Sequence, residues 1–236
     1  MLEQIADNIW SVPAPLRIFG VIALNTRMTI VCFANNELWL HSPIPISNEL
    51  KKEIDTLGTV TYLVAPSCLH HMFVGGWKEA YPNAKIYAAR GLQKKRPDLN
   101  IETIFREPTE QHWEEIEQYT IEGMPIVNEV LFFHKPSQTL IVTDFVFYMP
   151  NVSGFTAFYA YINGFYSKIT SPIIFKLAIK QKEDFRKSLV RVRHWQPKHI
   201  SMCHHFIYSE TDASTKFQAI LDGFQVEKQP EESLLH

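Results

Sequence analysis

The sequence predicts an α/β fold in which two mixed β-sheets pack against each other and helices cover their outer faces. Each half of the chain places strand patterns first and helix patterns after them, and a strand–helix–strand order in the first half favours parallel pairing. Hydrophobic residues make up 46% of the 236 residues and charged residues 20%, as is usual for a globular protein. We therefore expect residues 1–236 to form a single domain.

In the first half, short β-branched or aromatic runs are separated by Pro, Gly or Asn. These runs predict strands over 9–12, 21–24, 28–33, 38–40, 60–65 and 85–89. The run 60–65 is almost continuously apolar, as expected of a strand buried on both faces. Ser47 can cap a helix in which Leu50 and Ile54 follow at helical spacing. A loop running into a helix is expected over 68–81.

The second half repeats this order. Strands are predicted over 119–121, 129–133, 139–143 and 199–203, and helices over 182–194 and 213–221. The segment that follows Asp144 has a helical and aromatic pattern. No element is predicted over 90–116, where the glutamates fit a solvated helix face made by Glu110, Glu114, Glu115 and Glu117.

Charge and cysteine content exclude several classes of protein. The 23 basic and 25 acidic side chains nearly cancel, so a nucleic-acid partner is not expected. No stretch of about 18 uninterrupted apolar residues occurs, so we expect no membrane span. The N-terminus lacks the basic and apolar regions of a signal peptide. Three widely spaced cysteines form no disulfide framework, and a reducing, cytoplasmic location is therefore expected.

Polar side chains gather at the ends of three predicted strands. His70 and His71 follow the first of these strands, Asp144 follows the second, and His204 follows the third. Open α/β sheets bind ligands at the carboxyl ends of their strands. Imidazole and carboxylate groups converging there can hold a divalent metal ion. We therefore predict His70, His71, Asp144 and His204 as metal ligands, with Asp144 also in a catalytic role.

These blocks resemble the metallo-β-lactamase-like superfamily, whose first ligand loop has the form HxHxDHxGG. With Gly75-Gly76 aligned to the final glycines, the ligand positions hold Cys68, His70, Met72 and Phe73. The segment Leu140–Asp144 resembles the strand that ends in a metal-bridging Asp, and Ile200–His204 resembles the strand that ends in His. The resemblance implies an αββα sandwich and a metal-dependent hydrolase.

A closer resemblance is to the DUF4336 branch of this superfamily. The shared blocks are Asn8-Ile9-Trp10, Leu40-His41-Ser42-Pro43, Ala65-Pro66 followed by His70-His71, and Leu140 to Asp144. Short blocks in one order are informative about the fold, whereas activity has to be argued from the site itself.

Several usual ligands of the superfamily are missing from this sequence. Cys, Met and Phe occupy three of the four ligand positions of the loop, and no His lies near Gly123-Met124-Pro125, where the superfamily has another. Two His and one carboxylate match a mononuclear site. We therefore expect one divalent ion, zinc first and iron or manganese as alternatives, and the metal-free protein stays open. His71, His41, His134 and Cys68 are the candidate substitute ligands.

Each of these residues also has a structural interpretation. Either His of the pair 70–71 could bond a backbone carbonyl, and Asp144 could cap a following helix. The aromatic segment 145–166 could pack in the core, line an apolar pocket, or form a surface for a partner subunit or a membrane interface. For the pocket interpretation we expect a lining that includes His41, Cys68, Phe145, Phe147 and Tyr148.

Three functions are compatible with the sequence, and one of them, an Fe(II) enzyme that uses oxygen, would employ the same two-His, one-carboxylate set. The other two are as follows. The first is a metallo-hydrolase that acts on a small ester, thioester, lactone or phosphoester. The second is a non-catalytic protein of the same fold that binds a partner or an apolar ligand through residues 145–166. Apart from the metal no cofactor is predicted, and the sequence leaves the oligomeric state open.

Overall fold

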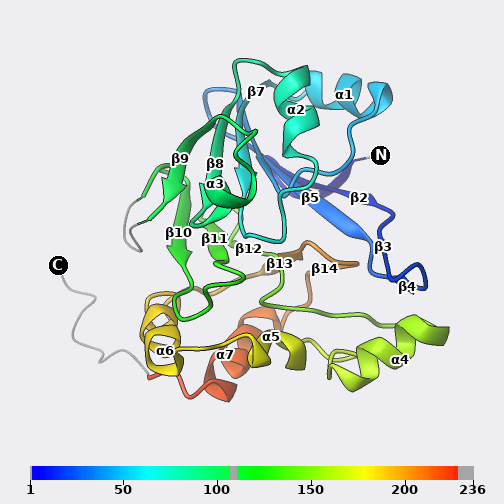
Figure 1. Cartoon of the computed structure of the whole chain (residues 1–236), viewed down its shortest axis with the longest axis vertical. Coiled ribbons are helices and arrows are strands. Elements are labelled where there is room, and N and C mark those ends of the chain that lie inside the picture. The colour runs from blue at the N-terminus through cyan, green and yellow to red at the C-terminus, as the bar shows by residue number, and fades with distance from the viewer. Residues whose placement is uncertain (1, 107–110, 228–236) are drawn as a thin grey trace.

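Two β-sheets pack face to face in the middle of the molecule, and helices cover the outer side of each sheet (Figure 1). The computed structural model describes residues 2–106 and 111–227. The predicted sandwich of two mixed sheets between helices is therefore confirmed. In the described residues, no helix combines the length and the apolar character needed to cross a bilayer.

The first sheet has seven strands in the order β1-β2-β5-β6-β7-β8-β9. They are β1 (Glu3–Ala6), β2 (Ile9–Ala14), β5 (Thr26–Cys32), β6 (Glu37–His41), β7 (Thr59–Ala65), β8 (Lys85–Ala89) and β9 (Ile101–Phe105). The pairs from β6 to β9 are parallel, as the strand–helix–strand order predicts. A separate two-stranded ribbon is formed by β3 (Arg17–Ile18) and β4 (Ile22–Ala23).

The second sheet has five strands in sequence order. They are β10 (Ile116–Thr120), β11 (Val130–His134), β12 (Thr139–Val142), β13 (His199–Met202) and β14 (Ile207–Tyr208). Strands β12 and β13 are parallel, so their carboxyl ends lie at the same edge of the sheet. That edge carries Asp144 and His204.

Seven helices complete the described fold. They are α1 (Asn48–Asp55), α2 (Val74–Ala80), α3 (Leu92–Lys95), α4 (Gly154–Ile162), α5 (Ile173–Leu177), α6 (Lys182–Val190) and α7 (Ala213–Gly223). Helix α1 starts as predicted, because the Leu50 N–H donates to Ser47 Oγ at 3.2 Å and Leu50 and Ile54 are buried. Figure 1 shows α1 and α2 on the outer side of the first sheet and α4 to α7 below the second.

Three layers of buried apolar side chains hold these elements together. One lies under α1 and α2, one lies between the sheets, and one lies between the second sheet and α5, α6 and α7. Trp39 of the first sheet meets Phe132 of the second edge-to-face in the middle layer, with ring centroids 5.1 Å apart. Thr29 and Ser201 also join the sheets through a buried hydroxyl pair at 2.8 Å.

The structure differs from the sequence-based prediction in three segments. The segment 90–116 contains α3 and β9, which the pattern did not predict. The acidic helix face is absent: Glu117 lies in strand β10 and accepts a hydrogen bond from Trp195 Nε1 at 2.6 Å, and Glu110 lies outside the described residues. No helix follows Asp144 directly, because Phe147 and Met149 form β-bridges with Thr170 and Tyr166 and the next helix begins only at Gly154.

Candidate metal centre

His70 is placed by a turn that ends strand β7. Pro66 breaks the strand, and the buried Ser67 Oγ then accepts the backbone N–H groups of Leu69 and His70 at 3.2 and 3.1 Å. The His70 ring turns inward, where its Nδ1 lies 2.9 Å from Ser42 Oγ. Ser42 follows β6 directly and is held in the left-handed region at φ 52°. This backbone conformation is unfavourable for a non-glycine residue, and here it points the hydroxyl at His70.

Asp144 is placed by the turn after β12, which a buried carboxylate shapes. Glu129 is fully buried, and its two oxygens accept the backbone N–H groups of Thr143 at 2.7 Å and Asp144 at 3.1 Å. Burial, together with the nearby charge of Asp144, raises the pKa of Glu129 to about 8. The role of Glu129 was not predicted from the sequence. The available signal was a lone acid at the start of the apolar run 130–133.

His204 follows β13 and has its tautomer fixed by the backbone. Its Nδ1 lies 2.7 Å from the carbonyl oxygen of Asn25, which can only accept, so Nδ1 carries a proton and Nε2 is the nitrogen that faces Asp144. The ring of Phe147 stacks on His204 with centroids 4.9 Å apart. Asn25 itself is held at φ 46°, a conformation that Asn tolerates better than most residues. Both the ring stacking and the hydrogen bond orient the imidazole.

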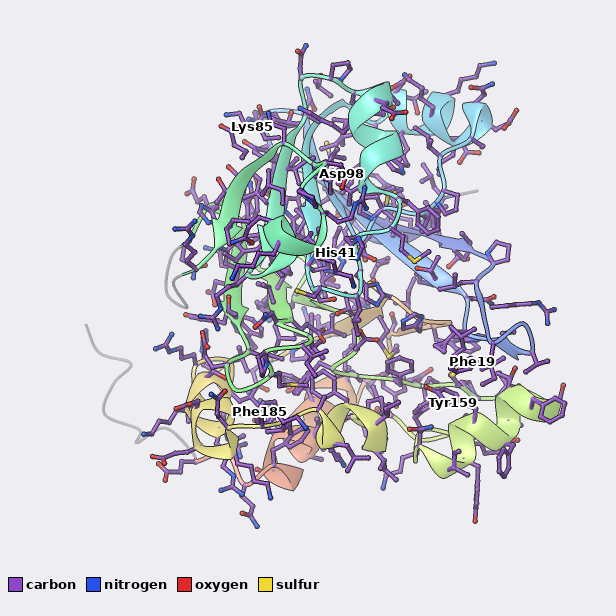
Figure 2. All side chains as sticks on the ribbon, in the orientation of Figure 1. Phe19, His41, Lys85, Asp98, Tyr159 and Phe185 are labelled. Carbon is purple, nitrogen blue, oxygen red and sulfur yellow. The ribbon has the colours of Figure 1, made fainter. Side chains whose placement is uncertain are left out.

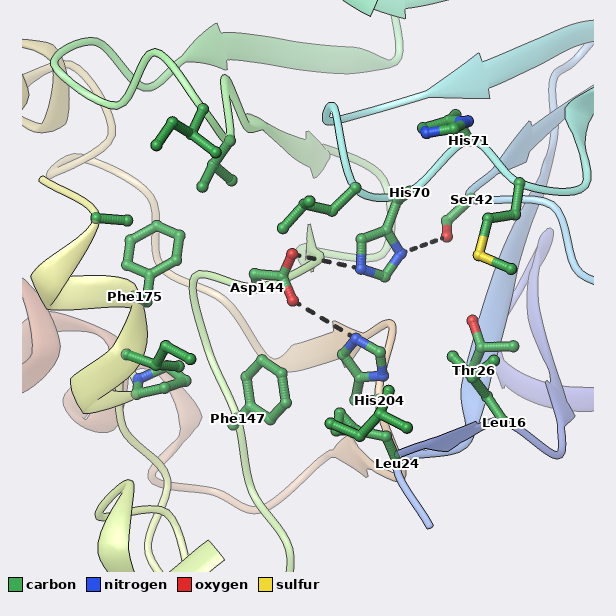
Figure 3. Close-up of a pocket in the computed structure, with 18 of the residues that line it drawn as sticks. Leu16, Leu24, Thr26, Ser42, His70, His71, Asp144, Phe147, Phe175 and His204 are labelled. Atoms are coloured by element: carbon green, nitrogen blue, oxygen red, sulfur yellow. Dashed lines mark hydrogen bonds and ion pairs between the residues drawn. The ribbon is translucent and has the colours of Figure 1, made fainter. Parts of the chain in front are cut away.

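The three side chains converge on one point. Asp144 lies between the two imidazoles, with Oδ2 3.5 Å from His70 Nε2 and Oδ1 3.5 Å from His204 Nε2 (Figure 3). One ligand atom from each residue lies within 4.8 Å of the others. Oδ2 of Asp144 is buried and has no hydrogen-bond partner among the described residues. These distances are longer than good hydrogen bonds, and two ligands at tetrahedral angles around one zinc ion stand about 3.4 Å apart.

Electrostatics keep the Asp144 carboxylate ionised. Burial alone would raise its pKa, but the charges and hydrogen-bonding capacity of His70 and His204 outweigh burial and hold the pKa below its usual range. An ionised carboxylate with an orphaned buried oxygen, beside two imidazoles with inward nitrogens, fits one divalent cation. The donor set matches the two-His, one-carboxylate type of site.

An apolar pocket of about 450 Å³ opens next to these three residues. Its walls are mostly aliphatic and aromatic, and His70, Asp144 and His204 lie in the middle of the lining residues drawn in Figure 3. Phe147 and Phe175 stand on the wall that faces the carboxylate (Figure 3). A site of this kind binds ligands that carry an apolar part next to a polar, reactive group.

Four of the five residues expected in the pocket lining are not there. Phe147 lines the pocket, whereas the next residue, Tyr148, points away from it because side chains alternate along an extended segment. Phe145 packs against Phe175 and Phe224 in the outer core.

His41 and Cys68 were also predicted to line the pocket, and neither of them does. His41, labelled in Figure 2, is fully buried and stacks on Trp39 in the layer between the sheets, and burial lowers its pKa well below the usual range. Its Nδ1 faces Cys203 Sγ at 3.8 Å. The thiol of Cys68 donates to the Arg90 carbonyl at 3.4 Å, and burial raises its pKa, so it packs as a small apolar side chain.

His71 does not join the three converging residues. It touches the pocket wall, but its Nδ1 lies 3.2 Å from the Arg96 guanidinium, which turns the ring away from Asp144 (Figure 3). The neighbour of His204 behaves likewise, since His205 Nε2 lies 2.7 Å from the Ala23 carbonyl oxygen. His134 lies far from this edge of the sheet and contacts Ser137 Oγ at 2.7 Å. The alternative role of Asp144 as a helix cap is wrong, because no helix begins there.

The loop positions that are ligands elsewhere in the superfamily carry no second metal site. Met72 is exposed and lines the outer part of the pocket, Phe73 offers no ligand atom, and the thiol of Cys68 is engaged with Arg90. The turn at Gly123-Pro125 contributes no imidazole. The donor set therefore fits one ion and does not fit two.

The sandwich and the strand-end site define the chain as a protein of metallo-β-lactamase fold. It is similar in structure to the DIM-1 metallo-β-lactamase (15% identity, TM-score 0.63, covering 94% of this chain and 97% of that chain). The metallo-β-lactamases of Pontibacter korlensis (11% identity, TM-score 0.63, 94% and 98% covered) and Hirschia baltica (10%, 0.61, 98% and 98%) are similar as well. At these identities the likeness establishes the fold alone.

Within this fold, the chain belongs to the family described as Domain of unknown function (DUF4336), whose model matches residues 6–154. The matched region includes His70 and Asp144 and ends before His204. No protein in the curated set matches the sequence.

Proposed function

We propose that this protein is a metal-dependent hydrolase with one ion, held by His70, Asp144 and His204. The observation that carries the proposal is the convergence of three ligand atoms from three strand ends, within 4.8 Å of one another. Zinc is the first choice for two imidazoles and a carboxylate, with iron and manganese as alternatives. We further propose that residues 1–236 form one domain, and that three unpaired cysteines suit a reducing, cytoplasmic location.

We assign each residue around the candidate metal centre a separate role in the proposed hydrolysis. When bound, a divalent ion would act as a Lewis acid and lower the pKa of water. Asn25 and Ser42 orient the two imidazoles through their Nδ1 atoms, and Glu129 fixes the turn that carries Asp144. Asp144 supplies the negative charge that attracts the ion and is the catalytic residue we propose for accepting a proton. The apolar walls exclude bulk water and hold the apolar part of the substrate.

The substrate class follows from the pocket. A cavity of about 450 Å³ accommodates a small molecule, and its apolar lining favours an ester, thioester, lactone or phosphoester with a hydrocarbon group. The second candidate function is binding of an apolar ligand without turnover. The loop 68–73 favours this second function, because three of its four ligand positions lack the usual ligands of the superfamily.

Metal analysis of the purified protein tests the proposal. About one equivalent of zinc, iron or manganese is expected in the wild type, with loss of the metal in His70→Ala and in His204→Ala. His71→Ala is the matched control, because it removes an imidazole from the adjacent position of the same loop and should keep the metal. Thermal unfolding with and without a chelator provides a second readout. A metal-free wild type, or equal metal loss in the His71 variant, would refute the assignment.

A further inference from the structure

Helix α4 presents its large apolar side chains to solvent. The residues that it buries are the small Thr156 and Ala160, whereas Phe155, Phe158 and Tyr161 are between 63% and 75% exposed. A surface helix ordinarily turns its large apolar residues towards the core. The inverted arrangement of α4 indicates that its outer side meets an apolar environment.

Two neighbouring elements extend this surface. The β3–β4 hairpin packs on α4, where the Ala23 N–H donates to Thr156 Oγ1 at 3.0 Å, and Phe19 at the hairpin tip is 88% exposed. Figure 2 shows Phe19 and Tyr159 at the same edge of the molecule. Helix α5 is joined to the end of α4, since the Ile173 N–H donates to the Asn163 carbonyl. We call the following six exposed side chains the apolar face: Phe19, Phe155, Phe158, Tyr161, Ile174 and Leu177.

The apolar face adjoins the mouth of the pocket that holds the candidate metal centre. Ile174 belongs both to this face and to the pocket lining, and Ile18 of the hairpin and Tyr159 of α4 also line the pocket. A hydrocarbon chain could therefore pass from the apolar face to Asp144 along apolar side chains. Single exposed apolar residues are common on protein surfaces, but a group of this size marks an interaction site.

The charges around the apolar face are all positive. Residues 145–182 contain four lysines and no acidic residue, and residues 8–26 contain the exposed Arg17 and no acidic residue, although the whole chain has a net charge of −2. The four lysines, Lys168, Lys176, Lys180 and Lys182, are exposed. Exposed aromatic side chains flanked only by cations suit the headgroup region of an anionic bilayer.

A second pocket of about 450 Å³ lies beside the first and is basic. It is lined by Lys168, Lys176 and Lys216, and by Ser171, whose Oγ is buried and has no hydrogen-bond partner among the described residues. The segment 165–178 contributes side chains to both pockets. Lys216 already pairs with Asp212 at 3.4 Å, so the ammonium groups of Lys168 and Lys176 and the unused hydroxyl of Ser171 are the groups that can bind a phosphate.

We propose that the apolar face docks on an anionic phospholipid bilayer, with a headgroup phosphate in the second pocket. The first pocket then takes its ligand, an amphiphile with a hydrocarbon chain, directly from the lipid surface. That the amphiphile is an ester hydrolysed at Asp144 depends on the proposed function, whereas the docking does not.

Co-sedimentation with vesicles of phosphatidylcholine alone, or mixed with phosphatidylglycerol, tests the docking. The wild type should bind the anionic vesicles strongly and the neutral ones weakly. Phe155→Ser/Phe158→Ser/Tyr161→Ser should lose binding to both. Lys168→Gln/Lys176→Gln/Lys180→Gln should bind the anionic vesicles about 100-fold more weakly, since each cation near such a surface contributes about fivefold.

The matched control is a triple variant with the same change in charge, made at the exposed lysines of α1, β8 and α3: Lys52→Gln/Lys85→Gln/Lys94→Gln. It should bind like the wild type, and circular dichroism melts check that each variant folds. The docking is overturned if the wild type ignores anionic vesicles, if the control loses as much binding as the test variant, or if light scattering shows a dimer that the serine variant dissociates. Metal analysis of the same samples separates the two proposals. A metal-free protein that binds vesicles would support the docking and refute the hydrolase. A metal-containing protein that does not bind vesicles would support the hydrolase and refute the docking.

Discussion

Ser42 offers a test of how the site is oriented, because two substitutions there separate orientation of His70 from backbone strain. Its hydroxyl lies 2.9 Å from His70 Nδ1, and its backbone is held at φ 52°. In the ligating tautomer, His70 donates its Nδ1 proton to Ser42 Oγ and leaves Nε2 free for the ion. Ser42→Ala removes the hydroxyl and keeps the strain, whereas Ser42→Gly removes both.

Loss of the hydroxyl and relief of the backbone strain have effects of comparable size, but the first changes metal affinity and stability whereas the second changes stability alone. Loss of an outer-shell partner of a ligand lowers metal affinity by about 10–100-fold. Loss of the hydrogen bond lowers the free energy of unfolding by about 1 kcal/mol. A Cβ in the left-handed region costs about 1–2 kcal/mol, which glycine avoids. We therefore expect equal losses of zinc affinity in both variants, with lower stability in Ser42→Ala and nearly unchanged stability in Ser42→Gly.

Zinc affinity can be measured by competition with a chromophoric chelator, and stability by urea unfolding of the metal-free proteins. Agreement of the two affinities, together with different stabilities, would support an orienting role for the hydroxyl. Wild-type affinity in either variant would refute it. Affinity that follows stability from one variant to the other would also refute it, because the metal would then report only on folding.

Three further predictions concern stability. Burial lowers the pKa of His134 from 6.5 to about 4, so the unfolded chain binds more protons in this window; stability should fall by up to about 3 kcal/mol as the pH drops from 6.5 to 4, and a urea series should show less of this loss in His134→Asn. Gly123→Ala should cost about 2–4 kcal/mol in urea unfolding, because its φ is 77° and a Cβ would lie 2.3 Å from the Gln181 carbonyl oxygen; wild-type stability would contradict this. Phe147→Ala should cost about 3–5 kcal/mol by the same assay, since it deletes a buried ring between His204 and Phe165, and a cost under 1 kcal/mol would mean that the ring is not packed as described.

The fold could be predicted largely because its central strands carry local signals. The run 60–65 is apolar except for Thr61, which is typical of a parallel strand covered on both sides, and it forms β7. Strand β9 lacks such a signal, because Ile101–Phe105 is half polar and gains its partner only from β8. The segment after Asp144 misled the prediction for another reason: a short apolar run cannot be assigned to helix or strand by periodicity alone, and the bridge to Thr170 decides it.

The candidate site could be predicted to the level of strand ends and no further. The rule that ligands bind beyond the carboxyl ends of strands brought His70, Asp144 and His204 together. Which member of each His pair turns inward depends on partners far away in the sequence, such as Arg96 for His71. Asn25 could not have been found at all, since it acts through its backbone carbonyl.

The missing ligands and the apolar pocket have a common structural cause. Two of the loop positions that carry ligands elsewhere in the superfamily hold Met72 and Phe73, and both line the pocket next to His70. Replacing a carboxylate and an imidazole by a thioether and a phenyl ring removes the charge that a second ion needs, and it provides apolar surface at the same place. The same substitutions therefore reduce the number of ions that the site can hold and enlarge the surface available to a hydrocarbon chain. On this reasoning, restoring donors as Met72→Asp/Phe73→His should raise the zinc content towards two equivalents and weaken the binding of hydrocarbon-chain ligands.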